Sequence, residues 1–339
     1  NAYRHFQTIV PHTARVWTNA DRLFSWMLRH LPFIRQDFAQ QRSDEYPVRL
    51  WTVAVFLVGA LPLLWKRGIG LLVIGDEFDT TDRRTHDGIP HYNGLYDQSR
   101  FFDQALTRYF HRNGWGISQF AIVRPLSELL VEKVLIERYP HLQQLQTSCH
   151  ATHKDGDRVR PCGRCEKCGR VVGMLTALGG DPTACGYTPD QVRYCLDKLS
   201  KQGAAQEGAA LQQLAFLLAQ RNLLPEGQIA AKAAVERPEI MRLRFDSEHS
   251  SMEDVPTDLR QPLYRIMLEH TTGAVQRSGR TWIDFDPLTS TDIVRPYRFE
   301  PPPTPPSKVA TMPGNAKRDH ILGQLTWPQP AQRFKQTDA

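Results

Sequence analysis

Four of the six cysteines in this chain of 339 residues lie close together, at Cys149, Cys162, Cys165 and Cys168. Zinc prefers four soft ligands at the corners of a tetrahedron, and a thiolate supplies both the softness and the negative charge. Four sulfur ligands leave no coordination position open for water, which is typical of a structural site. The spacing therefore predicts a structural Zn²⁺ site that closes residues 149–168 into one folded segment.

Two other interpretations of the cluster stay open. The cysteines can be free thiols, or His150 or His153, which flank Cys149, can replace one of them as an imidazole ligand. We expect Gly163 and Gly169 to adopt positive φ in tight turns beside the sulfurs. We also expect the thiolate charge to be compensated by the neighbouring basic residues Arg160, Arg164, Lys167 and Arg170.

The composition is typical of a folded protein with a sizeable core. Hydrophobic residues make up 41% of the chain, charged residues 23%, and the formal net charge is +6. This length predicts one large domain with a smaller one. A small positive charge that is spread along the chain makes nucleic acid an unlikely partner and suits a nucleotide or another acidic small molecule.

The sequence predicts no membrane partner. The most apolar run, residues 50–65, is interrupted by Gly59 and Pro62 and is shorter than the ~20 residues that a membrane span needs. It therefore predicts a buried helix. The clustered cysteines differ from a secreted disulfide framework, and the sequence shows no signal-peptide pattern. We expect a cytoplasmic protein.

Apolar runs typical of strands alternate with segments of helical periodicity before the cysteines. The run at residues 68–75 is unbroken and ends at a glycine, as in a strand buried on both faces of a parallel sheet. The predicted strands are residues 14–18, 68–75 and 119–123, and the predicted helices are 1–9, 21–30, 47–64, 98–112 and 127–138. This order predicts an α/β fold with a doubly wound parallel sheet. Because the first element is a helix, we expect the first strand to lie upstream of Asn1.

Several local features refine this prediction. Residues 76–97 are polar and predict a long, functional loop. Asn19 and Ser127 are expected to cap the helices that follow them. After the cysteines, helices are predicted at residues 169–178, from the capping box Thr188-Pro-Asp-Gln191 onward, and at 208–222. Weaker patterns predict a strand at 240–245, a helix at 259–271 and a strand at 281–285.

These features predict four parts of the chain. Residues 1–225 form the α/β domain, with the zinc knuckle at 149–168, and residues 226–299 form an accessory α+β extension at the end of the helical region. Residues 300–316 contain a proline-rich run that predicts a stiff linker. Residues 317–339 are expected to begin a second domain.

The cysteine pattern, with its first member in the context Thr147-Ser-Cys149, resembles the C-terminal part of 7-cyano-7-deazaguanine synthases, which belong to the PP-loop ATP pyrophosphatase superfamily. The chain is still more similar to the related muramoyl-peptide glutamate epimerase group. The similar pieces are Gly75-Asp76-Glu77 at a strand end, the tract from His91 to Asp103, Arg124-Pro125 and the cysteines. They fall in the order that the family shows.

The resemblance implies a doubly wound fold that binds ATP and Mg²⁺ and adenylates a small-molecule carboxylate with loss of pyrophosphate. The family's phosphate-binding Ser-Gly-Gly-x-Asp-Ser loop is not present in this sequence. We expect that loop, like the first strand, to lie upstream of Asn1. The tail Gln324-Leu-Thr-Trp-Pro328 resembles the opening of creatininase-type amidohydrolase domains, which implies coupling to a downstream amidohydrolase.

Ligands of open α/β sheets bind beyond the carboxyl ends of the strands. Asp76 and Glu77 follow the predicted strand at residues 68–75, and Asp79 comes next. We expect Asp76 and Glu77 to serve the reaction by binding a substrate amino group or Mg²⁺, which prefers carboxylate oxygens. The alternative is that they are solvated carboxylates of a loop.

Substrate binding is predicted at two other places. Tyr96, Asp97 and Arg100 precede or open the predicted helix at 98–112, and Arg124 ends a predicted strand. An arginine there can form paired hydrogen bonds with a carboxylate or phosphate, although a surface salt bridge is an equally ordinary role.

The predicted function is therefore that of a zinc-stabilised, ATP-dependent, carboxylate-activating enzyme. A non-catalytic zinc module that binds nucleic acid is the alternative from another class, and a degenerate scaffold that delivers substrate to an amidohydrolase is a third. Assembly into a homo-oligomer is an open expectation.

Overall fold

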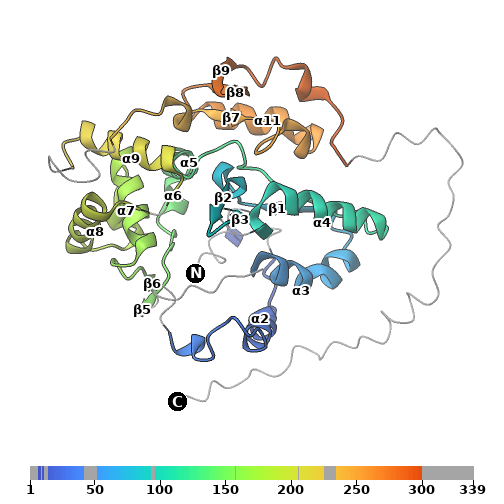
Figure 1. The fold of residues 1–339 in the computed structure, drawn as a ribbon, viewed down its shortest axis with the longest axis horizontal. Coiled ribbons are helices and arrows are strands. Elements are labelled where there is room, and N and C mark those ends of the chain that lie inside the picture. Colours follow the sequence, from blue (N-terminus) through green and yellow to red (C-terminus); the bar gives the residue numbers. More distant parts are fainter. Residues whose placement is uncertain are drawn as a thin grey trace, which may run out of the picture. The chain divides into compact units, whose positions relative to one another are not determined.

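The computed structural model describes residues 7–8, 10, 14–41, 52–92, 96–156, 158–204, 206–224 and 234–299, and Figure 1 labels their helices and strands. These residues belong to one unit, Asn1–Phe299, and Glu300–Ala339 form a second unit. The predicted linker at 300–316, the predicted second domain at 317–339 and most of the predicted helix at 1–9 lie outside the described residues.

Two parallel strands carry the candidate site. β1 (Leu71–Ile74) and β4 (Ser118–Ala121) pair in parallel, in the register Leu71 to Ser118 and Ile74 to Ala121. This pair confirms the predicted strands at residues 68–75 and 119–123. The described residues thus form a mixed fold of helices and small sheets, whereas the doubly wound PP-loop sheet stays a prediction.

The predicted strand at residues 14–18 is wrong. These residues are exposed, and no strand of the described chain pairs with them, so they lack the ladder that a strand needs. The next predicted helix is confirmed as α2 (Ala20–Arg29). Its predicted cap, Asn19, makes no side-chain hydrogen bond to the helix; instead, Thr18 Oγ1 accepts a hydrogen bond from the Ala20 N–H at 3.1 Å.

Two helices cover the parallel pair. α3 (Thr52–Lys66) confirms the predicted apolar helix, and α4 (Arg100–Arg112) confirms the helix predicted at 98–112. A buried cluster joins them to the strands through Leu72, Phe110 and Ile117, against which Leu57, Leu61 and Leu64 pack. Within the described ranges, no helix is long and apolar enough to cross a membrane.

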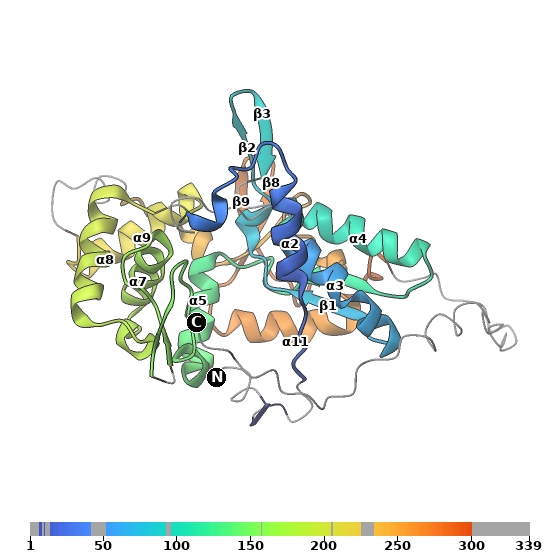
Figure 2. The ribbon, with the colours of Figure 1, turned by 90° about the horizontal axis from the view of Figure 1, so that it is seen from below.

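The segment predicted as a long loop at residues 76–97 is partly a β-hairpin. After a 3₁₀ turn, η2 (Phe78–Thr81), β2 (Arg83–His86) pairs antiparallel with β3 (Ile89–Tyr92). Asp87 and Gly88 form its turn with φ of 50° and 79°, the left-handed conformation that two-residue hairpins require and that Asp-Gly favours. Figure 2 shows the hairpin extending away from α4. A second 3₁₀ turn, η3 (Tyr96–Gln98), leads into α4.

The region after β4 is mainly helical, as predicted. It contains α5 (Glu128–Arg138), α6 (Pro140–Gln143), a small hairpin of β5 (His153–Asp155) and β6 (Arg158–Arg160), α7 (Glu166–Leu178), η4 (Pro182–Cys185), α8 (Pro189–Gln202) and α9 (Gly208–Gln220). Ser127 caps α5 by accepting from the Leu130 N–H at 3.2 Å, which confirms its predicted role. The predicted capping box is also confirmed, because Thr188 and Gln191 exchange side-chain and backbone hydrogen bonds.

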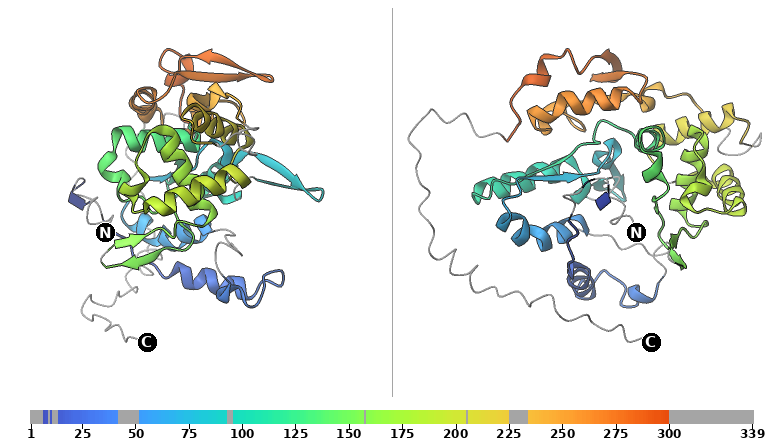
Figure 3. Two further views of the ribbon diagram at one scale, coloured as in Figure 1. Left: turned by 90° about the vertical axis from the view of Figure 1, so that its left-hand side faces the viewer. Right: turned by 180° about the vertical axis from the view of Figure 1, so that it is seen from behind.

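The helices α7, α8 and α9 pack together (Figure 3) around a core whose buried members include Val172, Leu175, Leu199, Leu214 and Leu218. Gly173 lies at the contact between α7 and α8. A Cβ atom there would lie 2.6 Å from Leu199 Cδ2, closer than packed atoms approach. A side chain at this position would therefore force the Leu199 side chain to move.

Residues 234–299 form an α+β segment. η5 (Pro238–Met241) leads into β7 (Leu243–Phe245), which pairs in parallel with β8 (Ala274–Ser278), and β8 pairs antiparallel with β9 (Thr281–Phe285). η6 (Met252–Asp254), α11 (Thr257–Leu268) and η7 (Thr291–Val294) complete the segment. Leu126 and Leu130 pack into its core with Phe245, Tyr264 and Met267, so the segment is joined to α5. β8 was not predicted.

Candidate metal centre and strand-end site

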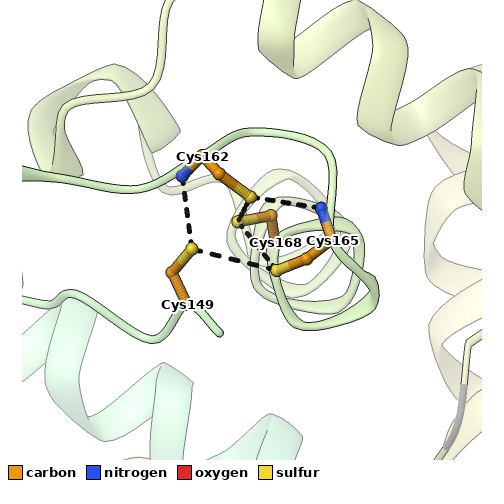
Figure 4. A group of neighbouring side chains, drawn as sticks. All are labelled: Cys149, Cys162, Cys165 and Cys168. Atoms are coloured by element: carbon orange, nitrogen blue, oxygen red, sulfur yellow. Dashed lines mark hydrogen bonds between the residues drawn. The ribbon is translucent and has the colours of Figure 1, made fainter. Parts of the chain in front are cut away.

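The four predicted zinc ligands come together. Cys149 follows α6, Cys162 follows β6, Cys165 is the N-cap of α7 and Cys168 lies in its first turn, and their Sγ atoms all lie within 4.8 Å of one another (Figure 4). The Sγ atom of Cys168 is 3.4 Å from that of Cys165 and 3.8 Å from that of Cys162. Tetrahedral ligands at a Zn–S distance of about 2.3 Å are about 3.8 Å apart. The spacing of the sulfurs thus fits a shared zinc ion.

Backbone amides point at the sulfurs. Cys149 Sγ accepts hydrogen bonds from the N–H groups of Ala151 at 3.3 Å and Cys162 at 3.2 Å, and Cys162 Sγ accepts one from Cys165 N–H at 3.3 Å. Although burial opposes ionisation, the N–H groups of Arg164 and Cys165 lower the pKa of the Cys162 thiol. Such donors stabilise thiolates, whereas burial raises the pKa values of the Cys149 and Cys168 thiols, so that among these three thiols only Cys162 is favoured as a thiolate before a metal binds.

The turns beside the sulfurs follow the prediction in part. Gly163 has φ of 67°, as expected, and a Cβ there would lie 2.4 Å from the Gln191 side chain. The prediction for Gly169 is wrong, because that residue lies inside α7, where the backbone is helical. Two of the basic residues expected around the thiolates have carboxylate partners instead: Arg160 with Asp155 and Arg170 with Glu128.

No histidine joins the cluster in the described chain. The group of possible metal ligands within this distance consists of the four cysteines, so the substitution of His150 or His153 for a cysteine gains no support. The other two cysteines are buried and do not belong to this group of possible ligands. Cys195 Sγ donates to the Gly163 carbonyl at 3.3 Å, and Cys185 Sγ accepts from Gln143 Nε2 at 2.9 Å.

The strand-end residues Asp76 and Arg124 also meet. Asp76 follows β1 and Arg124 follows β4, and because the strands are parallel their carboxyl ends lie at one edge, where Asp76 Oδ2 is 3.8 Å from Arg124 Nη2. A closer partner of Arg124 is Asp103 of α4, at 2.7 Å. Burial outweighs the attraction of Arg124 and raises the pKa of Asp76 to about 8.

The second terminal nitrogen of Arg124, Nη1, also has hydrogen-bond partners. It donates to Thr80 Oγ1 at 2.6 Å and to the Gln98 carbonyl at 3.0 Å. With Asp103, these contacts tie the segment after β1 to the start of α4. Arg124 is 5% exposed, so its predicted contact with a substrate would require one of these partners to be replaced.

Glu77 and Asp79 lie in an acidic environment. Burial and the nearby Glu128 raise the pKa of Glu77, and burial, Glu77 and Glu207 raise the pKa of Asp79 to about 7. A hydrogen bond from its own backbone N–H and the charges of Arg170 and Arg124 lower the pKa of Glu77, but burial outweighs them. Glu77 and Asp79 thus lie among several buried carboxyl groups, an arrangement that attracts a cationic group.

The other predicted substrate residues have partners within the chain. Arg100 is 5% exposed; its Nε forms a short contact with the Asp254 carboxylate, and its Nη1 donates to the Glu248 carbonyl at 3.1 Å. Asp97 Oδ2 accepts from the backbone N–H groups of Val53 at 2.9 Å and Ala54 at 3.2 Å, and so caps α3. The Tyr96 side chain is 46% exposed.

The structure reveals polar groups that sequence patterns did not single out. His249 donates or accepts at both ring nitrogens, with Asp246 Oδ2 at 2.8 Å from Nδ1 and Asp82 Oδ1 at 3.0 Å from Nε2. Its ring stacks on Phe78, and the Arg244 guanidinium carbon lies 3.9 Å from the centre of the Phe78 ring. These contacts hold residues 78–82 against the segment after β7. Because Phe78 and Asp82 are far along the chain from Arg244 and His249, no local pattern could have indicated these contacts.

Neither a family model, nor a curated protein, nor a solved structure matches this chain. The similarity to PP-loop enzymes therefore depends on the motifs described above. The possible four-cysteine metal centre and the carboxyl edge of β1 and β4 are the structural features from which a function can be argued.

Proposed function

We propose that this chain is the zinc-stabilised, substrate-binding part of an ATP-dependent, carboxylate-activating enzyme of the PP-loop class. The zinc ion would be held by Cys149, Cys162, Cys165 and Cys168, and its role is structural because all four ligands come from the protein. It would tie the loop after α6 to the N-terminus of α7.

The observation that carries the proposal is the arrangement at the carboxyl ends of β1 and β4. Parallel strands bring Asp76, Glu77 and Arg124 to one edge, the place where open α/β folds bind ligands. Burial raises the pKa values of Asp76, Glu77 and Asp79, that of Asp76 to about 8. Perturbed carboxyl groups of this kind gather at functional sites more often than elsewhere.

The residues of this edge suit the proposed chemistry. Activation requires a substrate carboxylate oxygen to attack the α-phosphorus of ATP while pyrophosphate leaves, and Mg²⁺ bound with ATP would neutralise charge that develops on the phosphates. Glu77 and Asp79 offer the carboxylate oxygens that Mg²⁺ or a substrate ammonium prefers. Asp76 can hold a proton near neutral pH.

Exchange of labelled pyrophosphate into ATP tests the proposal, measured with this chain and with one extended upstream, over a panel of small carboxylates. We expect exchange that depends on the carboxylate and falls at least tenfold in Glu77→Gln. The matched control is Glu236→Gln, at an exposed glutamate. Absence of exchange with every carboxylate, in both chains, would count against the proposal.

One observation favours a second candidate, the scaffold without catalysis. Both predicted substrate arginines, Arg100 and Arg124, are buried against carboxylates of the chain itself, Asp254 and Asp103. A scaffold of this kind needs no nucleotide. Equilibrium binding of ATP with Mg²⁺ to the extended chain separates the two candidates, because only the enzyme requires it.

A further inference from the structure

A group of large apolar side chains lies exposed around α2. Trp17 is 79% exposed, Leu23 47%, Trp26 58% and Phe33 65%. Exposed apolar residues are ordinary when they are scattered over the surface, but here they are concentrated in α2 and the segments on either side of it, and such a concentration is typical of an interaction site. We call these four residues, with Arg22 and Arg29, the α2 surface.

The α2 surface is the outer side of an amphipathic helix. The inner side of α2 is buried through Ala20 and Leu28, and α2 contacts α3 (Figures 1 and 3). With 3.6 residues per turn, Arg22, Trp26 and Arg29 lie close together on the side of the helix away from Ala20, and Leu23 lies between Trp26 and Ala20. The helix thus has a buried face against α3 and presents Trp26 with two arginines on its exposed side.

Two cations of this surface are available for a partner. Among the described residues, Arg22 and Arg29 have no ion pair or hydrogen bond from their side chains. By contrast, Arg35 pairs with Asp37 at 2.7 Å, and the Arg15 guanidinium lies 3.9 Å from the centre of the Trp17 ring. Unpaired arginines beside exposed aromatic rings fit a partner that offers both negative charge and apolar material.

We propose that the α2 surface docks onto the surface of an anionic phospholipid bilayer. Tryptophan, phenylalanine and leucine enter the boundary between headgroups and acyl chains, while arginines bind the lipid phosphates. Each arginine near an anionic surface strengthens binding by a factor of about five. A helix of 10 residues gives reversible, peripheral binding and spans nothing.

The shape and charge of the surface favour lipid over the other anionic partners. A helix with projecting rings is convex, whereas an acidic peptide needs a groove in which to lie. A nucleic acid needs many phosphate contacts, yet this surface offers two available arginines, and Asp21 lies on the same helix. The proposal departs from the expectation, drawn from the sequence, that the protein has no membrane partner. It is independent of ATP chemistry.

Co-sedimentation of the full chain with lipid vesicles tests the proposal. We expect binding to vesicles of phosphatidylcholine with phosphatidylglycerol, and little binding to phosphatidylcholine alone. The double variant Arg22→Gln with Arg29→Gln should lower the partition coefficient roughly 30-fold. Trp17→Ser with Trp26→Ser should abolish binding, and because both rings are exposed the variant should keep the melting temperature of the wild type.

Matched controls lie on other elements. Arg108→Gln with Arg112→Gln removes the same charge from α4, and Ile89→Ser removes an exposed apolar side chain from β3; both should bind as the wild type does. Equal binding to neutral and anionic vesicles, equal loss in the controls, or no binding at all would overturn the proposal. So would binding of single-stranded DNA that the α2 variants abolish while vesicles stay unbound.

Discussion

Asp76 and Arg124 follow two parallel strands and face each other at the edge of the sheet, with Asp76 Oδ2 3.8 Å from Arg124 Nη2. The same nitrogen lies 2.7 Å from Asp103 Oδ2, so Arg124 pairs mainly with Asp103. For Asp76, the effect of burial therefore outweighs the attraction of Arg124 and raises the pKa of its carboxyl group to about 8. One guanidinium between two buried carboxyl groups thus leaves one of them able to keep a proton at neutral pH.

The pKa of Asp76 predicts a dependence of stability on pH. Because the pKa of Asp76 in the folded protein, about 8, is above its ordinary value of 3.8, the protonated carboxyl group favours the folded state, and this stabilisation is lost as the pH rises toward 8. Asp76→Asn keeps a neutral side chain. We expect the urea midpoint of the variant to rise relative to the wild type between pH 6 and 8 and then to level off. Asp258→Asn, at an exposed aspartate, should show no such trend.

His249 provides a second pH-dependent contact. Although burial disfavours its charge, hydrogen bonds to Asp246 and Asp82 raise its pKa to about 9 from 6.5. The charged His249 ring therefore stabilises the folded protein fully below pH 6.5, and this stabilisation is lost as the pH rises through 9. We expect His249→Ala to destabilise the protein most at pH 6 and least above pH 9.5, as measured by urea unfolding. A loss that does not vary with pH would show that the ring acts through packing alone; His91→Ala is the exposed control.

The sulfur cluster predicts about one zinc ion for each chain. Metal analysis of the purified protein, followed by chelator titration, checks this number. Cys168→Ser should lose zinc and lower the melting temperature steeply, because structural zinc contributes about 10–16 kcal/mol of binding free energy in small folded sites. Cys185→Ser is the matched control, since its thiol is buried but bonded to Gln143 outside the cluster. Unchanged zinc content in Cys168→Ser would contradict the assignment.

Asp97 is expected to stabilise α3. Its carboxylate accepts from two N–H groups in the first turn of that helix, so Asp97→Ala should cost about 0.5–2 kcal/mol of the free energy of unfolding. Asp97→Asn retains an acceptor oxygen and should lose less. Urea midpoints of the two variants measure the difference. If both variants lost the same stability, the hydrogen bonds would not be the cause.

Local patterns determined much of the secondary structure. The periodicity of apolar residues located α2, α3, α4 and both strands of the parallel pair, and the capping residue Ser127 was identified correctly. The spacing of the four cysteines predicted their convergence, because residues so close in sequence can meet whatever the rest of the chain does. The Asp87-Gly88 turn also carried a hairpin pattern that was missed within a segment predicted as a loop.

Only the tertiary structure decided the partners of the strand-end residues. Arg100 and Arg124 were predicted to face a substrate, yet one pairs with Asp254 and the other with Asp103. A cation is drawn to whichever carboxylate the fold brings into its buried surroundings, and Asp254 is 154 positions away along the chain from Arg100. The sequence by itself therefore determined the elements and the sulfur cluster. The pairing of buried charges, which sets their pKa values, arose from contacts between distant segments.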